Sequence, residues 1–220
     1  MLLDNIKLNI KNTHFNTIIF DLNGTITNSV SNKPKHILFR NDYIEDKIGM
    51  PLYGALPDQT SKALDFYMLN TEEYYRYRNS VIDWNIFHSY NNTTFDILSS
   101  LHKSGYNLVL YTDCYMEQVE PTLEILGIKS FFKLIISREL GYKKPSTKAF
   151  RFISKTLGVS LNQLLMVAND YKQDLKPLRA IGGNIIWIKS EKNLKDAQAI
   201  IDKHDEGILK MYKSFNLEFT

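Results

Sequence analysis

The chain has 220 residues, of which 44% are hydrophobic and 12% aromatic, so it can form a sizeable core and is not expected to be disordered. Its net charge is only +3 and its basic residues form no dense block, which argues against nucleic-acid binding. No window approaches the roughly 20 apolar residues of a membrane span. The single cysteine, Cys114, permits no internal disulfide. We therefore expect a cytoplasmic protein with neither a nucleic-acid nor a membrane partner.

Five short apolar runs without polar alternation predict buried parallel strands, because both faces of such a sheet are covered. They span 17–21, 107–112, 132–137, 164–168 and 184–189. Helical patterns separate the later runs, and glycine follows most of them; they span 93–104, 116–126, 147–157 and 173–181. This alternation predicts an α/β fold with a Rossmann-like, doubly wound parallel sheet.

One long stretch, between the first strand and Thr93, contains no convincing buried strand, and a structureless loop of that length is uncommon in a compact domain. Helical patterns at 42–47, 57–69 and 72–87 predict an inserted helical subdomain instead. We therefore expect an α/β core domain of residues 1–30 and 91–220 and a helical cap subdomain of residues 31–90. The chain ends, 1–16 and 207–220, carry short apolar alternations and are expected to pack together at the sheet edge.

The first candidate site residue is Asp21, which ends an apolar run and precedes a polar turn of Asn23, Gly24 and Thr25. A carboxylate at this position can attack phosphorus. Gly24 lets the backbone turn closely around a phosphate, whose oxygens the exposed N–H groups can bind. The plainer alternative is an Asp that ends a strand and starts a turn.

Two further candidates follow later strands. Thr112 ends the run 107–112, where its hydroxyl can donate to a phosphate oxygen; alternatively, it is a strand-favouring residue before a helix-capping Asp113. Lys144 stands directly before Pro145, which can start the next helix, and a fixed ammonium there can neutralise a nucleophile and a phosphate. A surface lysine in a loop is its alternative. Asp113 would repel a phosphate unless it points away or meets a substrate amine.

The fourth candidate is an acidic turn after the run 164–168, with Asp170 and Asp174 four residues apart. Carboxylate oxygens at a strand end suit Mg²⁺, which favours one or two carboxylates together with phosphate and water. The alternative is a polar turn with an N-capping Asp. Asn169, the residue before Asp170, is an alternative to it as the first oxygen ligand of this motif.

Taken in order, these motifs resemble those of the haloacid dehalogenase-like phosphohydrolases, over about residues 17–190. The resemblance implies bound Mg²⁺, a small phosphorylated substrate, and a mobile α-helical cap inserted between the first and second motifs. It implies the following roles: Asp21, Asn23, Thr112 and Lys144 in catalysis, Gly24, Thr25 and Asp113 in substrate or phosphate binding, and Asp21, Asn23, Asp170 and Asp174 in metal binding. In this scheme, Asp21 becomes an aspartyl-phosphate.

Asn23 departs from the family pattern, in which an Asp protonates the leaving group and then activates water. Its backbone carbonyl can still help to bind Mg²⁺, but its side chain cannot cycle a proton. We therefore expect a Mg²⁺-dependent phosphohydrolase slowed by roughly 10²–10⁴-fold. The alternative is a catalytically impaired phospho-ligand-binding or regulatory protein. An introduced Asn23 that traps substrate is a third interpretation, whereas the paired acids disfavour a metal-free dehalogenase.

The predicted cap is rich in aromatic residues, which could stack on a flat substrate group or, more simply, fill the core of a small helical bundle. His88, near the end of the cap, is a candidate acid at neutral pH. Cys114 follows Thr112 by two residues and is expected to be a small packed side chain.

Overall fold

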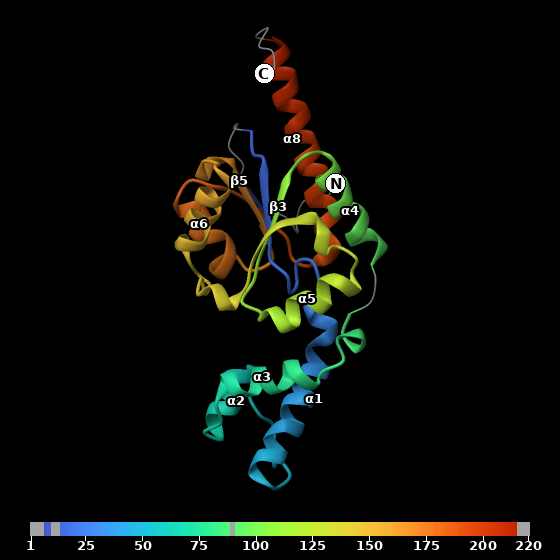
Figure 1. Cartoon of the computed structure of the whole chain (residues 1–220), viewed down its shortest axis with the longest axis vertical. Helices are drawn as coiled ribbons and strands as arrows, with labels where there is room; N and C mark the ends of the chain where they lie inside the picture. Colours follow the sequence, from blue (N-terminus) through green and yellow to red (C-terminus); the bar gives the residue numbers. More distant parts are fainter. Residues whose placement is uncertain (1–6, 10–13, 89–90, 215–220) are drawn as a thin grey trace. The chain divides into compact units, whose positions relative to one another are not determined.

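The computed structural model describes residues 7–9, 14–88 and 91–214 of the chain (Figure 1). The chain divides into two compact units. Met1–Asn28 and Tyr90–Thr220 form an α/β core unit, and Ser29–Ser89 form a helical unit. Within the described residues, no helix is both long and apolar enough to cross a bilayer.

The core unit is built on a six-stranded sheet in the order β1-β6-β5-β2-β3-β4. Except for β1, every strand in this order is parallel to its neighbours among β6, β5, β2, β3 and β4. This confirms the predicted α/β fold with a doubly wound parallel sheet. The parallel strands are β2 (Thr17–Phe20), β3 (Asn107–Tyr111), β4 (Phe132–Ile136), β5 (Leu164–Ala168) and β6 (Asn184–Trp187).

Helices cover both faces of this sheet, which explains why its strands are apolar without alternation. Ile18 and Phe20 pack into one core cluster, with residues of α4 (Asn92–Lys103), α5 (Met116–Ile125) and α8 (Leu194–Ser214). Ile19 points to the opposite face and packs with residues of α6 (Thr147–Leu157) and α7 (Lys176–Ala180). Successive strand residues point to opposite faces, so every position of β2 must be buried.

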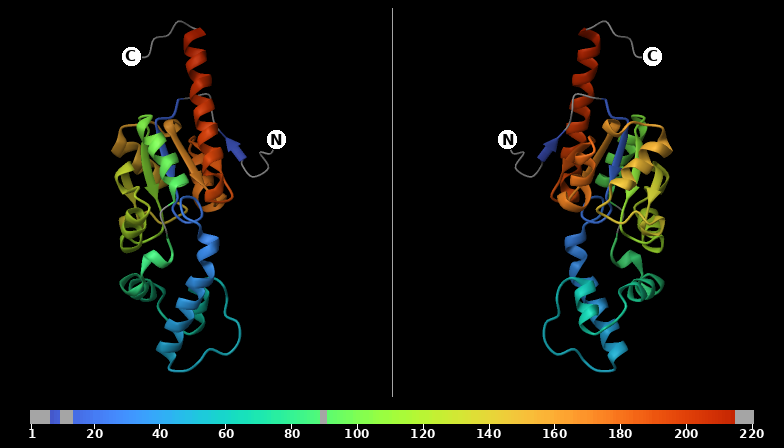
Figure 2. Two further views of the ribbon diagram at one scale, coloured as in Figure 1. Left: turned by 90° about the vertical axis from the view of Figure 1, so that its right-hand side faces the viewer. Right: turned by 90° about the vertical axis from the view of Figure 1, so that its left-hand side faces the viewer.

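The two ends of the chain add elements that the sequence patterns did not resolve. β1 (Lys7–Asn9) pairs antiparallel with β6 and forms one edge of the sheet. At the other end, α8 packs against α4 and continues beyond the core (Figure 2). Helix α8 therefore includes most of the segment 207–220, in which the sequence showed only a short apolar alternation and no helix was predicted. The remaining terminal positions, 1–6, 10–13 and 215–220, lie outside the described residues.

The helical unit contains α1 (Ser29–Ile48), α2 (Thr60–Phe66), α3 (Thr71–Val81) and a short 3₁₀ turn, Trp84–Ile86. Five buried side chains form its core: Tyr43, Ile44, Ala63, Leu64 and Tyr74. Helix α1 begins well before the predicted pattern at 42–47. The sequence pattern did not reveal its first half, because that half carries Pro34 and few apolar residues. Helix α3 ends at Val81 rather than near residue 87, and the 3₁₀ turn follows it.

The segment after β5 also differs from the predicted helix at 173–181. A π-helical turn, Tyr171–Leu175, comes first, and α7 follows with Pro177 in its first turn. Gly183, just before β6, permits the close approach of α7, because an added Cβ would lie 2.3 Å from Cδ1 of Leu178.

Candidate active site

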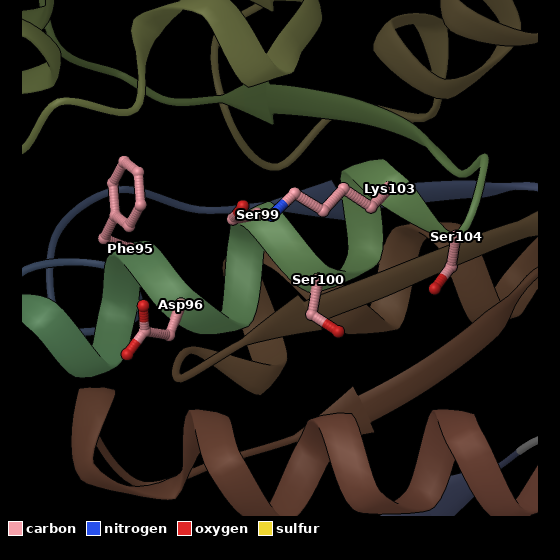
Figure 3. Close-up of a pocket in the computed structure, with 6 residues that line it drawn as sticks. All are labelled: Phe95, Asp96, Ser99, Ser100, Lys103 and Ser104. Carbon is pink, nitrogen blue, oxygen red and sulfur yellow. The ribbon is translucent and has the colours of Figure 1, made fainter.

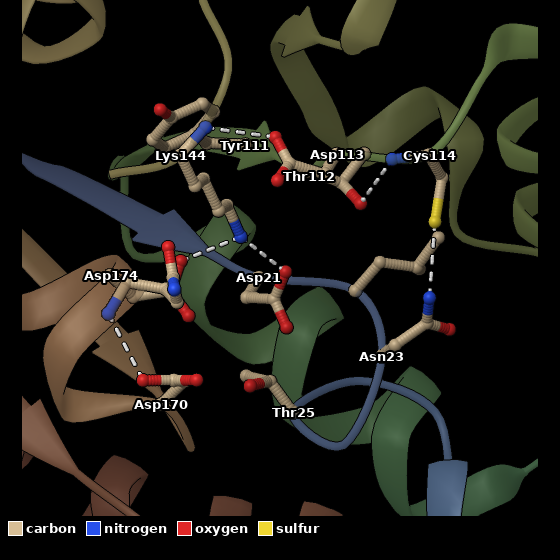
Figure 4. Close-up of polar contacts among 12 residues, drawn as sticks. Asp21, Asn23, Thr25, Tyr111, Thr112, Asp113, Cys114, Lys144, Asp170 and Asp174 are labelled. Atoms are coloured by element: carbon tan, nitrogen blue, oxygen red, sulfur yellow. Dashed lines mark hydrogen bonds and ion pairs between the residues drawn. The ribbon is translucent and has the colours of Figure 1, made fainter. Parts of the chain in front are cut away.

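Three neighbouring strands deliver polar residues to one edge of the sheet. β2 lies between β5 and β3, and the three run parallel, so their carboxyl ends meet. Asp21 directly follows β2, Thr112 directly follows β3, and Asp170 follows β5 by two residues. Ligands of open α/β sheets bind at this edge. Figure 4 shows these side chains around a common centre.

Lys144 joins two of the acidic residues. Its Nζ lies 2.5 Å from Oδ1 of Asp21 and 2.6 Å from Oδ1 of Asp174 (Figure 4). The Lys144 side chain is only 5% exposed, and the Asp174 side chain 3%. Lys144 is therefore a buried ammonium between two carboxylates, and the alternative of a surface lysine in a loop does not apply.

Burial and charge act together on the pKa values of this group. Burial alone would lower the pKa of Lys144, but the carboxylates of Asp21 and Asp174 raise it above its ordinary value, so the ammonium stays charged. Burial, assisted by the charge of Asp21, raises the pKa of Asp174 to about 7, although Lys144 opposes this shift. The protonated form of Asp174 is therefore favoured more than that of a free carboxyl group.

Asp170 differs from Asp174 in both exposure and contacts. It is exposed, and its Oδ1 accepts the backbone N–H groups of Lys172 (2.9 Å) and Gln173 (3.0 Å). It therefore caps the π-helical turn, as the plainer interpretation of this motif expected. The described residues include no group of three or more His, Cys, Asp or Glu side chains arranged to hold a metal ion.

Asn23 is held by two side chains. Its Nδ2 donates to Sγ of Cys114 at 3.0 Å (Figure 4), and its Oδ1 accepts from Oγ1 of Thr27 at 3.3 Å. Cys114 in turn donates its backbone N–H to Oγ1 of Thr112 at 3.2 Å. The turns that follow β2 and β3 are thus linked through Cys114, which does more than pack.

Gly24 and Thr25 shape the turn after Asp21. Gly24 has a φ of +83°, which favours glycine, and its N–H donates to the Thr27 carbonyl at 2.7 Å. Thr25 is fully buried; its Oγ1 lies 3.3 Å from Oδ1 of Asn169 and accepts the Asn169 N–H at 3.2 Å. The Thr25 hydroxyl therefore ties the turn after β2 to the turn after β5.

Asp113 points to the loop that carries Lys144. Its Oδ1 accepts the backbone N–H of Lys144 at 2.9 Å (Figure 4). Of the two possibilities left open for Asp113, contact with a substrate amine or a direction away from the phosphate, this contact favours the second. Pro145 does not start a helix, since α6 begins at Thr147 with Ser146 as its N-cap.

Thr27, which holds Asn23, was not among the predicted site residues, because it belongs to none of the sequence motifs. His88 belongs to the helical unit.

Elsewhere, a groove of about 370 Å³ runs along α4 (Figure 3). It is lined by Phe95, Asp96, Ser99, Ser100, Lys103 and Ser104, none of which is a candidate site residue.

Comparisons with known proteins identify the family to which this chain belongs. Residues 18–188 match the family model described as haloacid dehalogenase-like hydrolase. A phosphoglycolate phosphatase of Salmonella paratyphi A is 30% identical over 122 residues, which cover 55% of this chain and 46% of the relative. A pyrophosphatase PpaX of Bacillus velezensis is 25% identical over 169 residues, 70% of this chain and 74% of the relative. The chain spans about half the length of the first of these curated relatives.

Solved structures share the fold. A predicted phosphoglycolate phosphatase from Haemophilus somnus superposes with a TM-score of 0.60 at 22% identity, covering 79% of this chain and 84% of that one. A HAD phosphatase from Thermococcus onnurineus gives a TM-score of 0.61 at 17% identity, covering 83% of this chain and 97% of that one.

Proposed function

Because the chain belongs to the haloacid dehalogenase-like hydrolase family, we propose that it is a phosphatase that hydrolyses small phosphate monoesters through Asp21. The relatives named above carry phosphatase and pyrophosphatase names, which supports a small phosphorylated substrate. We further propose that the helical unit, Ser29–Ser89, is the cap subdomain of this family.

The contact of Lys144 with both Asp21 and Asp174 is the observation that carries the proposal. A buried ammonium beside a strand-end carboxylate can bind a phosphate and offset the charge that develops during its transfer. Such a site is more than an Asp that ends a strand, because the lysine comes from a distant loop and is almost fully buried.

The chemistry requires Asp21 to act as a nucleophile. Its carboxylate attacks phosphorus as the bond from phosphorus to the ester oxygen breaks, the leaving oxygen takes a proton from solvent to become an alcohol, and an aspartyl-phosphate forms. Water then attacks phosphorus in that intermediate, which releases inorganic phosphate and a proton and restores the carboxylate. Lys144 holds Asp21 in place and neutralises phosphate charge through both steps.

The oxygen donors present fit a Mg²⁺ ion. Mg²⁺ usually keeps several waters and takes one or two carboxylates with substrate phosphate, so it needs no cluster of three acidic side chains. We assign the Asp21 carboxylate, the Asn23 backbone carbonyl and Asp170 to it. Asp174, whose Oδ1 faces Lys144, we assign to holding Lys144 instead. When bound, the ion would supply charge neutralisation for the transferred phosphoryl group.

Asn23 limits the rate in this scheme. Positioned acid–base catalysis contributes roughly 10²–10⁴-fold, which is about 3–5 kcal/mol of barrier. The amide of Asn23 donates to Cys114 and accepts from Thr27, and these neutral contacts move no proton to a leaving group. This observation also supports the alternative function, a phospho-ligand-binding or regulatory protein with little turnover.

One assay separates the two functions. We expect slow hydrolysis of p-nitrophenyl phosphate that requires Mg²⁺, stops on addition of EDTA and is abolished by Asp21→Asn, which removes the nucleophile but keeps its shape. If the parent protein is no faster than Asp21→Asn on a broad panel of phosphate esters, the phosphatase proposal fails. A parent protein that still binds phosphate esters would then act as a binding protein.

A further inference from the structure

The loop that carries Lys144 is tied to the turn after β3. Oη of Tyr111 donates to the Tyr142 carbonyl at 2.9 Å, and the Arg138 N–H donates to the Cys114 carbonyl at 3.0 Å. The Lys144 ammonium also lies over the Tyr111 ring, 5.0 Å from its centroid. The segment between β4 and α6 is thus fastened to its neighbour at several points.

Two carboxylates link these segments. Asp113, after β3, accepts from the loop that carries Lys144, whereas Glu139, on that loop, accepts from the segment after β3. Oδ1 of Asp113 accepts the backbone N–H of Lys144 at 2.9 Å (Figure 4). Oε1 of Glu139 accepts the backbone N–H of Met116 at 2.7 Å. Both are charge-assisted hydrogen bonds between the same two segments, but only that of Asp113 ends on the residue whose side chain enters the site.

We propose that Asp113 is a positioning residue that acts through Lys144. The inference rests on the proposed phosphatase function for its kinetic meaning. By holding the Lys144 backbone, Asp113 fixes the starting point of a long side chain, and the ammonium at its far end then lies between Asp21 and Asp174.

The length of the lysine side chain makes this fixing necessary. Four methylene groups separate the Lys144 backbone from its ammonium, and each added rotamer that a loosened backbone allows weakens the contact with Asp21. A displacement of about 1 Å at a catalytic group can cost on the order of 10²-fold in rate. This role needs an acceptor oxygen on Asp113, which an uncharged amide also offers, although its hydrogen bond is weaker.

Three substitutions separate positioning from other roles. Asp113→Ala removes the acceptor, Asp113→Asn keeps an acceptor oxygen without the charge, and Glu139→Ala breaks the matched bond that does not reach Lys144. With p-nitrophenyl phosphate and Mg²⁺, we expect Asp113→Ala to lower kcat by on the order of 10–10²-fold, with a smaller change in KM. Asp113→Asn should keep most of the parental kcat. Glu139→Ala should lower the melting temperature about as much as Asp113→Ala while keeping the parental kcat.

Two results would overturn the inference. Equal losses in Asp113→Ala and Asp113→Asn would mean that the site needs the negative charge of Asp113 and not only its acceptor oxygen. A parental kcat in Asp113→Ala would mean that the bond to the Lys144 backbone is not needed.

A second measurement needs no turnover. An amine-acetylating reagent, N-hydroxysuccinimidyl acetate, is applied to the folded proteins, and fragment ions in mass spectrometry compare Lys144 with its exposed neighbour Lys143. We expect Lys144 to be protected in the parent, in Asp113→Asn and in Glu139→Ala, and to react several-fold faster in Asp113→Ala. Unchanged protection in Asp113→Ala contradicts the inference, whatever the activity. The expected pattern together with a parent no faster than Asp21→Asn would leave positioning intact and reject only the phosphatase function.

Discussion

At the scale of single residues, the buried charges at the site do not balance. Asp21 and Asp174 carry two negative charges when both are ionised, and Lys144 carries one positive charge between them. An excess charge in a buried place is costly. The raised pKa of Asp174, about 7, is one response to this cost. A cation beside Asp21 would be another, which is consistent with the proposed metal role.

The first prediction concerns Asn23→Asp. We expect kcat for p-nitrophenyl phosphate to rise at least tenfold, because positioned acid–base catalysis typically contributes roughly 10²–10⁴-fold. An Asp side chain retains the oxygen that accepts from Thr27, so the turn should keep its form. The measurement is steady-state kinetics with saturating Mg²⁺.

Asn23→Ala is the control for this prediction, since it removes the amide without adding an acid. We expect it to stay at or below the parental rate. No gain in Asn23→Asp would mean that another group already supplies the proton, or that a different step limits turnover.

Sequence motifs predicted which residues stand at the strand ends, but not where their side chains point. Asp21 and Thr112 stand at the ends of apolar runs, and Lys144 stands directly before Pro145, so these positions can be found in the sequence alone. Asp113 and Thr25 sit in turns, where backbone angles and rotamers decide between facing a ligand and holding a neighbouring loop. Their contacts with Lys144 and Asn169 join residues distant in sequence and follow no local pattern.

At the scale of secondary-structure elements, the helical unit depends on a buried arginine. Arg40 on α1 is 1% exposed. Its Nη1 donates to the carbonyls of Pro57 (2.7 Å) and Asp58 (3.3 Å), and its Nε and Nη2 donate to Oδ1 of Asn41. The guanidinium therefore fastens the loop between α1 and α2 onto α1, which a single aliphatic or ammonium group cannot do.

The second prediction is that Arg40→Met destabilises the protein by roughly 1–3 kcal/mol, because the buried side chain loses its hydrogen bonds to Pro57, Asp58 and Asn41, each worth about 0.5–1.5 kcal/mol. Urea unfolding measures this loss. Arg76→Met, at an exposed position on α3, is the matched control and should change stability by no more than about 0.5 kcal/mol. Equal effects of the two substitutions would contradict the role given to Arg40.

Two histidines of the helical unit have lowered pKa values. Burial, with the charges of Arg78 and His88, lowers the pKa of His36 from its ordinary value of 6.5 to about 4. Burial likewise lowers the pKa of His88 to about 4. Both imidazoles stack on aromatic rings, His36 on Phe87 and His88 on Trp84. Each is therefore held in its neutral form.

The third prediction follows from the sign of these shifts. Between pH 6.5 and 4 the unfolded chain binds more protons at His36 and His88 than the folded chain does, so stability falls as the pH falls through this window. The protection factors of the backbone amides of residues 29–88 against hydrogen exchange, corrected for the intrinsic exchange rate at each pH, should fall on acidification. In a His36→Leu/His88→Leu variant this fall should be clearly smaller. An identical pH response in the parent and the variant would contradict the prediction.

The secondary structure of the two units was predictable to different degrees. The five parallel strands were predicted almost to the residue, because burial on both faces leaves continuous apolar runs. Helix α1 was predicted only in part, since Pro34 and a polar first half hide its periodicity. The π-helical turn at Tyr171–Leu175 was not predicted, because no sequence pattern marks such a turn.

At the scale of the whole molecule, each unit has a core of its own. Both faces of the sheet are packed in the core unit, while the helical unit encloses a separate cluster around Tyr43, Leu64 and Tyr74. The candidate residues Asp21, Asn23, Thr112, Lys144 and Asp170 all belong to the core unit. Ligands of that site should therefore act on the stability of the core unit directly.

The fourth prediction uses this linkage. A ligand that binds only the folded chain stabilises it by about 2.7 kcal/mol at a concentration of 100 Kd. For a chain of this size, each kcal/mol of stabilisation raises the melting temperature by roughly 2–4 °C. We therefore expect Mg²⁺ to raise the melting temperature and EDTA to reverse the rise.

Asp170→Asn should weaken this response, since it removes a proposed ligand but can still cap the π-helical turn. Asp196→Asn, on α8, is the control and should respond like the parent. A melting temperature that ignores Mg²⁺ in the parent would contradict the metal assignment.

The antiparallel strand β1 has a consequence for how the protein can be handled. Without it, β6 would expose a full row of unpaired backbone N–H and C=O groups, and such an open strand readily recruits strands of other molecules. Lys7–Asn9 cover that row with only three residues. Removing residues 1–9, and β1 with them, should thus promote self-association and precipitation, even though no residue of the candidate site is removed.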